Sequence, residues 1–222
     1  MKNSLTLFAA ALAMAVAGAF AKETPENAKL LKMTDPYEVL AENIPAGDIK
    51  DVLAVEKAFE KAEQLKEGTK ALLPKATASE FDIAYGAMQD ARAKKDGVGI
   101  ALAAAEIYKL IIESLNVATL VIPKDVDLLD YIGFRGTALL KASPQNWEAI
   151  AKNASVANVY WKRIHAKVTH EKLAAAVEKA LKEMNAAAAS HDSAASMTAA
   201  KELLDLVDEL ENFYTGKPIS VS

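Results

Sequence analysis

Apolar residues recur every three to four positions along most of the chain, and no segment shows a sustained alternation of apolar and polar residues. This periodicity predicts a short helix at 36–43 followed by seven main helices. The predicted main helices cover residues 48–66, 77–96, 98–121, 125–142, 143–165, 169–190 and 194–214. The sequence therefore predicts an all-α protein built as an antiparallel up-down helical bundle or bundles.

Several residues are of the types that begin or end helices. Thr77 and Glu80 have the spacing of a capping box, which predicts a helix that starts at Thr77. Ser143 precedes a proline that fits the first position of a helix. Gly68 lies where a helix C-terminus is expected.

The segment 171–214 repeats the earlier segment 80–115 when the two are shifted by 96 positions. The most informative matched pairs are Met88 with Met184, Asp96 with Asp192, and Glu106 with Glu202. This repeat predicts an internal duplication of a three- or four-helix unit, with units at 22–122 and 123–216 and a tail at 217–222. It leaves open whether the two units stand in tandem or share one core.

The helix predicted at 98–121 is apolar almost all round, which is typical of the most buried helix of a bundle. Its only charged residues are Glu106, Lys109 and Glu113, and their spacing of three and four places them on one narrow face. Three charges in the middle of a membrane span would be costly. We therefore expect this helix to be buried in protein rather than in lipid.

The first residues have the three parts of a secretory signal peptide. Lys2 is basic, residues 5–16 are apolar, and Ala19-Phe20-Ala21 has the pattern of a cleavage site. The apolar part is shorter than the ~20 residues that a membrane span requires. We therefore expect residues 1–21 to be removed and the mature chain to reside in the periplasm, with no integral membrane segment after cleavage.

Charge and composition exclude several function classes. The chain has 26 basic and 30 acidic residues with their signs interleaved, which is not typical of a nucleic-acid-binding surface. It has no cysteine, so disulfides, thiolate metal sites and covalent c-type haem are excluded. It also lacks a nucleophile elbow, an H-E-x-x-H motif and a phosphate-binding glycine loop. These absences favour a protein that is not an enzyme.

The fourth and fifth main helices carry the most distinctive aromatic and polar residues. The candidate ligand-binding residues are Tyr131, Arg135, Trp147 and Trp161. An inward-facing Arg135 would need an anionic partner, either a structural carboxylate such as Asp127 or Asp130 or an acidic ligand. Gly133 and Gly136 lie on one face of the same helix, where glycines usually mark a close approach of another helix or an interruption.

Two histidines lie on either side of one predicted turn. His165 and His170 could form part of a metal site, with Glu171 as a further ligand. In the alternative interpretation, His165 interacts favourably with a helix C-terminus and His170 is a solvated residue of a first helical turn. His191 cannot join them, because 21 residues of helix separate it from His170 by ~30 Å.

Part of the chain has the pattern of a known helical family. A tryptophan opens one helix in Asn146-Trp147-Glu148, His191-Asp192 joins two Ala-rich helices, and Phe213-Tyr214 ends the last one. Over about 70 residues these features resemble the class II cytochromes c, which are cytochrome c-prime-like helical bundles. That family attaches haem through C-x-x-C-H in its last helix. The corresponding stretches, 207–211 and 111–115, contain neither cysteine nor histidine, so the resemblance implies the bundle without covalent haem.

Two hypotheses follow from these observations. The first is a secreted, periplasmic, non-enzymatic helical-bundle protein without a cofactor, which binds a partner protein or a small, anionic ligand. The second is a periplasmic haem- or metal-binding redox or carrier protein that holds its haem non-covalently, as cytochrome b562 does. Met184 and the histidines motivate the second hypothesis, although Met184 also fits an apolar core stripe.

Overall fold

A computed structural model describes residues 24–43 and 52–221. This part of the chain forms nine α-helices, two short 3-10 helices and no strand, which confirms the all-α prediction. The helices are α1 (Pro25–Lys32), α2 (Asp35–Asn43), α3 (Val52–Leu72), α4 (Lys75–Ala93), α5 (Gly97–Glu113), α6 (Lys124–Lys141), α7 (Trp147–Ile164), α8 (Glu171–Ala189) and α9 (Ser193–Thr215), with 3-10 turns at Val117–Thr119 and His165–Lys167. The predicted signal peptide, residues 1–21, lies outside the described residues.

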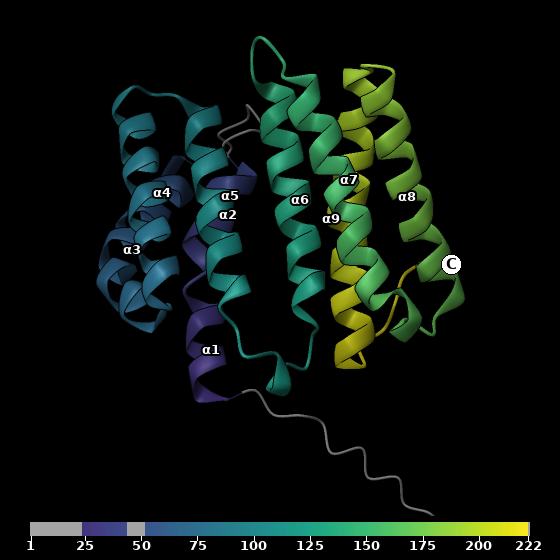
Figure 1. Cartoon of the computed structure of the whole chain (residues 1–222), viewed down its shortest axis with the longest axis horizontal. Coiled ribbons are helices and arrows are strands. Elements are labelled where there is room, and N and C mark those ends of the chain that lie inside the picture. The colour runs from purple at the N-terminus through teal and green to yellow at the C-terminus, as the bar shows by residue number, and fades with distance from the viewer. Residues whose placement is uncertain (1–23, 44–51, 222) are drawn as a thin grey trace, which may run out of the picture.

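The main helices form two groups of four with the same arrangement. In the first group α5 packs on α2 and α4, and α2 also packs on α3. In the second group α9 packs on α6 and α8, and α6 also packs on α7. Helices α5 and α6 lie side by side and join the two groups (Figure 1).

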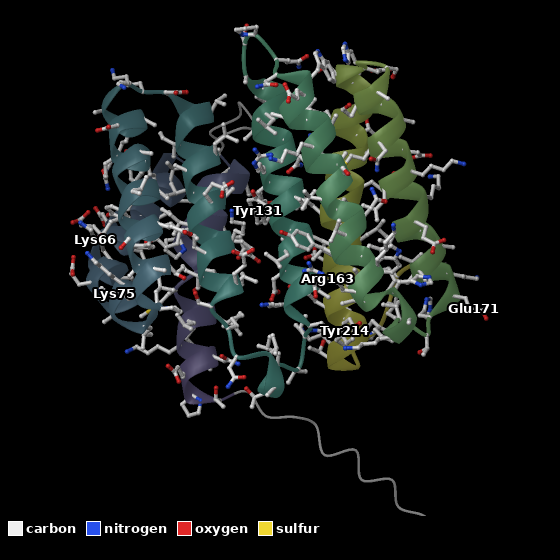
Figure 2. All side chains as sticks on the ribbon, in the orientation of Figure 1. Lys66, Lys75, Tyr131, Arg163, Glu171 and Tyr214 are labelled. Carbon is white, nitrogen blue, oxygen red and sulfur yellow. The ribbon has the colours of Figure 1, made fainter. Side chains whose placement is uncertain are left out.

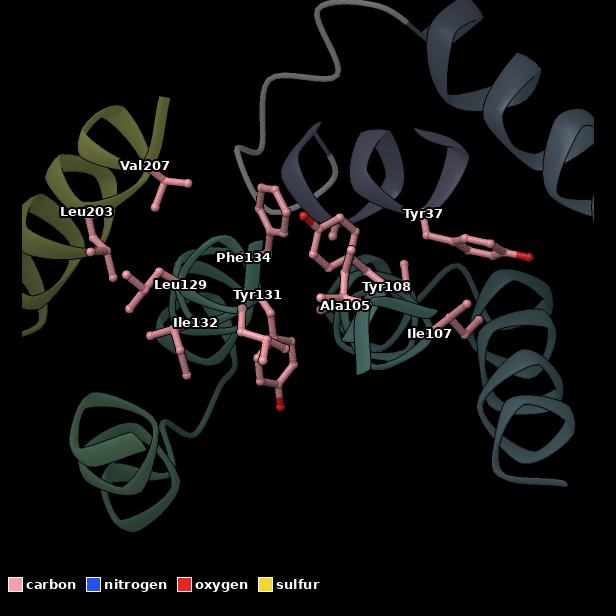
Figure 3. Close-up of a cluster of buried hydrophobic side chains, with 14 of the residues drawn as sticks. Tyr37, Ala105, Ile107, Tyr108, Leu129, Tyr131, Ile132, Phe134, Leu203 and Val207 are labelled. Carbon is pink, nitrogen blue, oxygen red and sulfur yellow. The ribbon is translucent and has the colours of Figure 1, made fainter. Parts of the chain in front are cut away.

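Buried apolar side chains from both groups form one connected cluster. Between the groups, the rings of Tyr108 on α5 and Phe134 on α6 meet edge to face with their centroids 5.6 Å apart (Figure 3). Ile107 on α5 and Ile132 on α6 are fully buried on the sides of their helices that face away from this contact, toward the interiors of their own groups (Figure 3). Each such side chain stabilises the fold by ~1.5–3 kcal/mol. The core is thus continuous across α5 and α6, whereas the division of the chain into units at 22–122 and 123–216 stays a prediction.

The two hairpins of the predicted repeat, α4–α5 and α8–α9, turn in the same way. The residue before each N-cap aspartate has a left-handed backbone, with φ of 56° at Lys95 and 55° at His191. Asp96 and Asp192 each accept a hydrogen bond from the backbone N–H three residues later, at 2.9 Å in both turns. Each also donates its own N–H to the carbonyl oxygen five residues earlier, again at 2.9 Å. Residues 96 positions apart therefore occupy matching places in the two hairpins.

Gly133 and Gly136 mark close helix contacts, as predicted. A Cβ atom at Gly133 would lie 2.4 Å from Cδ2 of Leu204 on α9. A Cβ atom at Gly136 would lie 3.2 Å from Nδ2 of Asn153 on α7. The absence of these side chains lets α6 approach both neighbours.

Several predicted helix ends were wrong. The helix expected to stop before Gly68 continues to Leu72, and Gly68 lies inside it beside Met33, whose methyl group would be 3.5 Å from a Cβ atom at that glycine. Helix α4 begins at Lys75 without a side-chain cap, so Thr77 is not its N-cap. The helix that starts after Ser143 begins only at Trp147, where Asn146 provides the cap.

The helix predicted at 98–121 ends at Glu113. The chain then bends through a 3-10 turn, and the buried side chain of Asn27 on α1 holds the bend. Asn27 donates from Nδ2 to the carbonyl oxygen of Asn116 at 2.9 Å and accepts the Asn116 N–H at 3.0 Å. This two-way contact spans 89 residues of sequence, so periodicity alone could not reveal it.

Candidate functional site

Two hollows flank the line along which α5 and α6 meet. The polar cleft lies between α5, α6 and α7 and has a volume of about 320 Å³. The apolar trough lies between α4, α5 and α6 and has a volume of about 500 Å³. Glu106, Lys109 and Arg135 line both hollows and so form the ridge between them. The polar cleft is also lined by Glu113, Tyr131, Ile132, Lys152, Asn153, Val156 and Tyr160.

Glu106 is the centre of a charged network that joins α5 to α6. The Tyr131 hydroxyl donates to Oε1 of Glu106 at 2.6 Å, and Nε of Arg135 lies 3.4 Å from the same oxygen. Lys109 forms an ion pair with Oε2. Burial alone would raise the pKa of Glu106, but hydrogen bonds from Lys109 and Tyr131 and the charge of Arg135 outweigh it, so the pKa lies below its usual value of 4.5. Glu106 is therefore ionised at neutral pH.

Arg135 is fixed from two sides. Besides its contact with Glu106, it donates from Nη1 to Oδ1 of Asn153 on α7 at 3.3 Å. Asn153 is 3 % exposed and in turn donates from Nδ2 to the carbonyl oxygen of Ile132 at 2.9 Å. No further hydrogen bond joins Arg135 to a described residue, and its side chain, which is 24 % exposed, lines both hollows. The guanidinium group is thus held in one orientation, while part of the side chain remains accessible to a ligand.

The partner of Arg135 differs from the one expected from sequence. We expected Asp127, Asp130 or an acidic ligand, and the structure shows Glu106 instead. The carboxylate that pairs with Arg135 comes from α5, whereas Asp127 and Asp130 lie eight and five residues before Arg135 on its own helix. Glu106 belongs to the narrow charged face of α5 that its spacing predicts, but spacing alone does not identify Arg135 as its partner.

Tyr131 is brought to Arg135 as predicted. Its ring leaves α6 on the side away from α2, whereas Phe134 points toward α2 and Tyr108 (Figure 3). Figure 2 places Tyr131 between the two helix groups. Burial, together with the charge of Glu106 and the hydrogen bond to it, raises the pKa of Tyr131 far above its usual value of 10. Tyr131 therefore acts as a neutral hydrogen-bond donor.

The rim of the polar cleft carries two further charges. Lys152 and Glu113 are exposed, and neither makes an ion pair with another described residue. With Lys109 and Arg135, the cleft holds three cationic side chains against the two carboxylates of Glu106 and Glu113. Its net charge of +1 favours an anionic guest over a cationic one.

The two predicted tryptophans lie elsewhere. Trp147, at the start of α7, stacks on His191 of the α8–α9 turn with ring centroids 4.8 Å apart. Trp161 is buried, and its ring meets His165 at 5.3 Å. Its indole N–H has no hydrogen-bond partner among the residues that the structure describes. Neither tryptophan lines the polar cleft or the apolar trough.

The histidines that were metal candidates take different roles. His165 Nε2 lies 3.0 Å from Oε1 of Glu178 on α8. His170 is the N-cap of α8, because its Nδ1 accepts the backbone N–H of Leu173 at 3.1 Å, so the helix begins at Glu171 rather than at the predicted residue 169. Within residues 24–43 and 52–221, no group of three or more His, Cys, Asp or Glu side chains is placed to hold a metal ion.

A separate set of carboxylates lies where α2, α6 and α9 approach one another. Partial burial, followed by the charges of Glu42 and Glu211, raises the pKa of Glu38 to about 7. Burial, with the charge of Glu211 as the next cause, raises the pKa of Asp130 well above its usual value. Burial likewise raises the pKa of Asp208 and of Glu211. This cluster therefore stores electrostatic repulsion when it is fully ionised.

No protein-family model, curated protein or solved structure matches the chain. Among the described helices, none combines the length and the apolar character that crossing a membrane requires.

Proposed function

We propose that the chain is an exported, non-enzymatic binding protein whose ligand is a small anion held in the polar cleft. The observation that carries this proposal is Arg135, which is fixed by Glu106 and Asn153 while its partly exposed side chain lines both hollows. A guanidinium group recognises carboxylates through paired N–H donors. Because the protein has already immobilised this group, little side-chain entropy is lost on binding.

The surroundings of Arg135 support an anionic guest. Lys109 and Lys152 line the same cleft, and the Tyr131 hydroxyl occupies one oxygen of Glu106 by donating a hydrogen bond to it. The cleft volume of about 320 Å³ lies at the lower end of the range of small-molecule sites, ~300–1,000 Å³. The ligand that fits this cleft is therefore small.

The protonation states favour binding over catalysis. A general acid or base works best when its pKa lies near the working pH. The pKa of Glu106 is lowered and that of Tyr131 is strongly raised, so neither group exchanges its proton readily at neutral pH. Lys109 and Arg135 are committed to Glu106 as ion-pair partners. These groups are therefore suited to binding an anion rather than to transferring a proton.

The proposal is tested by isothermal titration calorimetry with hexanoate and with its uncharged analogue hexanamide. Wild-type protein should bind hexanoate more tightly than hexanamide, and Arg135→Gln should weaken hexanoate binding about 10- to 100-fold, the value of a charged hydrogen bond. Arg92→Gln is the matched control, because Arg92 forms a surface pair with Glu56 on the α3–α4 side. Equal binding of the two compounds, or unchanged binding in Arg135→Gln, would refute the proposal.

A further inference from the structure

The apolar trough adjoins the polar cleft at the ridge formed by Glu106, Lys109 and Arg135. Besides this ridge, the residues that line it are Glu80, Ile83, Ala84, Ala87, Gly99, Leu102, Ala103, Leu110 and Leu139. Most of these side chains are apolar, and several are small, which hollows the wall formed by α4. Ile83 is 73 % exposed, an unusual position for a large aliphatic side chain.

The second helix group provides an internal comparison for this surface. Three apolar positions of the trough correspond, 96 residues later, to polar residues on α8 and α9. The pairs are Ile83 with Lys179, Ala87 with Glu183, and Leu102 with Thr198. In the second group, Lys179 lies 3.6 Å from Glu183 and 3.5 Å from Glu202, as is typical of a solvated surface.

The backbone does not account for this difference. The α4–α5 and α8–α9 hairpins share the same left-handed turn residue and the same aspartate caps, at the same distances. A hairpin of this geometry therefore folds with a polar surface at these positions. In the first copy Ile83 and Ala87 are exposed, whereas Leu102 is half-buried and packs against the core. Exposing apolar side chains to water gains nothing unless something apolar covers them.

We infer that the anion of the proposed function is the carboxylate of a straight-chain amphiphile, whose hydrocarbon chain lies in the apolar trough. This inference rests on the proposed function, because Arg135 holds the head group. The trough extends along α5 from the ridge at Glu106 to Gly99, a rise of about 10 Å, which suits a medium-length acyl chain. Lys109 and Arg135 supply cationic charge only at the ridge end.

The shape of the trough favours a small molecule over a protein partner. Its volume of about 500 Å³ lies within the range of small-molecule sites. Helices α4 and α6 wall it on both sides, and a stable protein interface would instead need ~800 Å² from each partner.

The inference is tested by calorimetric titration with butyrate, hexanoate, octanoate and decanoate, each below its micellar concentration. Affinity should rise about three- to fourfold for each added methylene up to octanoate, as expected for burial of hydrocarbon. The triple variant Ile83→Lys, Ala87→Glu, Leu102→Thr carries the residues that the second hairpin already accepts. This variant should bind butyrate as tightly as the wild type does. Its affinity should no longer rise as the hydrocarbon chain of the ligand lengthens.

The reciprocal variant Lys179→Ile, Glu183→Ala, Thr198→Leu is the matched control. It makes the second hairpin apolar without an arginine beside it, so the stoichiometry should stay at one ligand per chain. A second binding site in this variant would show that apolar surface alone suffices and would overturn the inference.

The outcomes separate the inference from the proposed function. If short carboxylates bind through Arg135 but affinity is flat with chain length, or the triple variant keeps the gain, the inference is wrong and the proposed function stands. If no carboxylate of any length binds, both are wrong. Chain-length dependence that the triple variant abolishes, with Arg135→Gln weakening every ligand, supports both.

Discussion

At the scale of single residues, Glu106 determines the character of the site. It accepts the Tyr131 hydroxyl at 2.6 Å and neutralises Lys109 and part of Arg135. Two cations beside one carboxylate leave one positive charge without an internal counter-ion, and a partly buried charge of this kind is stabilised by an anionic guest. The same pairing that stabilises the contact of α5 with α6 thus prepares the cleft for a ligand.

The carboxylates between α2, α6 and α9 make stability depend on pH. Folded Glu38 keeps its proton up to about pH 7, whereas in the unfolded chain it loses it near pH 4.5. The folded state therefore binds more protons between these values, and stability falls as pH rises through that window. The pKa values of Asp130, Asp208 and Glu211 are also raised, so they contribute with the same sign.

Glu38→Gln should remove much of this repulsion. At pH 8 we expect a stabilisation on the order of 1 kcal/mol, or about 2–4 °C in Tm, because solvent screens this exposed side chain. At pH 4.5 the effect should largely vanish, since folded Glu38 is protonated there. Thermal unfolding followed by circular dichroism at the two pH values measures this. Glu60→Gln, on the exposed face of α3, should show no such pH dependence, and a Glu38→Gln curve parallel to the wild type would contradict the account.

Residue types indicated part of the site but not its pairing. Tyr131 and Arg135 were predicted together because they lie one turn apart on one helix, a relation that sequence spacing gives directly. Glu106 and Asn153 come from α5 and α7, and they reach Arg135 only through the packing of α6 against both. Trp147 and Trp161 were distinctive by size alone, and packing at the ends of α7 places them against His191 and His165.

At the scale of elements, α6 depends on glycine for its contact with α9. Gly133→Ala should destabilise the protein by about 1 kcal/mol, because an overpacking cost of ~1–3 kcal/mol against Leu204 exceeds the gain of up to ~1 kcal/mol in helix propensity. Gly86→Ala, in the middle of α4, is the control, since no atom lies within 4 Å of its Cβ position. The Gly86→Ala variant should be more stable to unfolding than the wild type by ~0.5–1 kcal/mol. Urea unfolding measures both changes, and equal effects in the two variants would refute the close contact at Gly133.

Periodicity predicted the order of the eight helices from α2 to α9, but it missed α1, and several predicted helix ends were wrong. The breaks within the α4–α5 and α8–α9 hairpins were predicted, and the structure adds that Asp96 and Asp192 cap the second helix of each hairpin. The bend after Glu113 is held by Asn27 of α1, and α3 continues past Gly68, which lies beside Met33 at the end of α1. A helix end that is fixed by a distant segment carries no local mark in the sequence.

At the scale of the whole molecule, the continuous core predicts one cooperative unit. Both tryptophans lie on α7, so their fluorescence reports on the second group, whereas circular dichroism reports on all helices. The two signals should unfold together. Phe81→Ala, at a fully buried position in the first group, should cost ~3–5 kcal/mol and lower both midpoints equally.

Leu181→Ala, in the core of α8, provides the symmetric comparison and should also shift both signals together. Two separate domains would behave differently. In that case Phe81→Ala would lower part of the circular dichroism transition and leave the tryptophan transition in place.

The central claim is that the junction of α5 and α6 binds an anion with an apolar chain. The most direct measurement is a crystal structure of the protein with 8-bromooctanoate, in which anomalous scattering locates the bromine. The account predicts the carboxylate within hydrogen-bond distance of Arg135 and the bromine between α4 and α6, beside Leu102 and Leu139. A ligand ordered elsewhere while Arg135 contacts only Glu106 and Asn153 would contradict it.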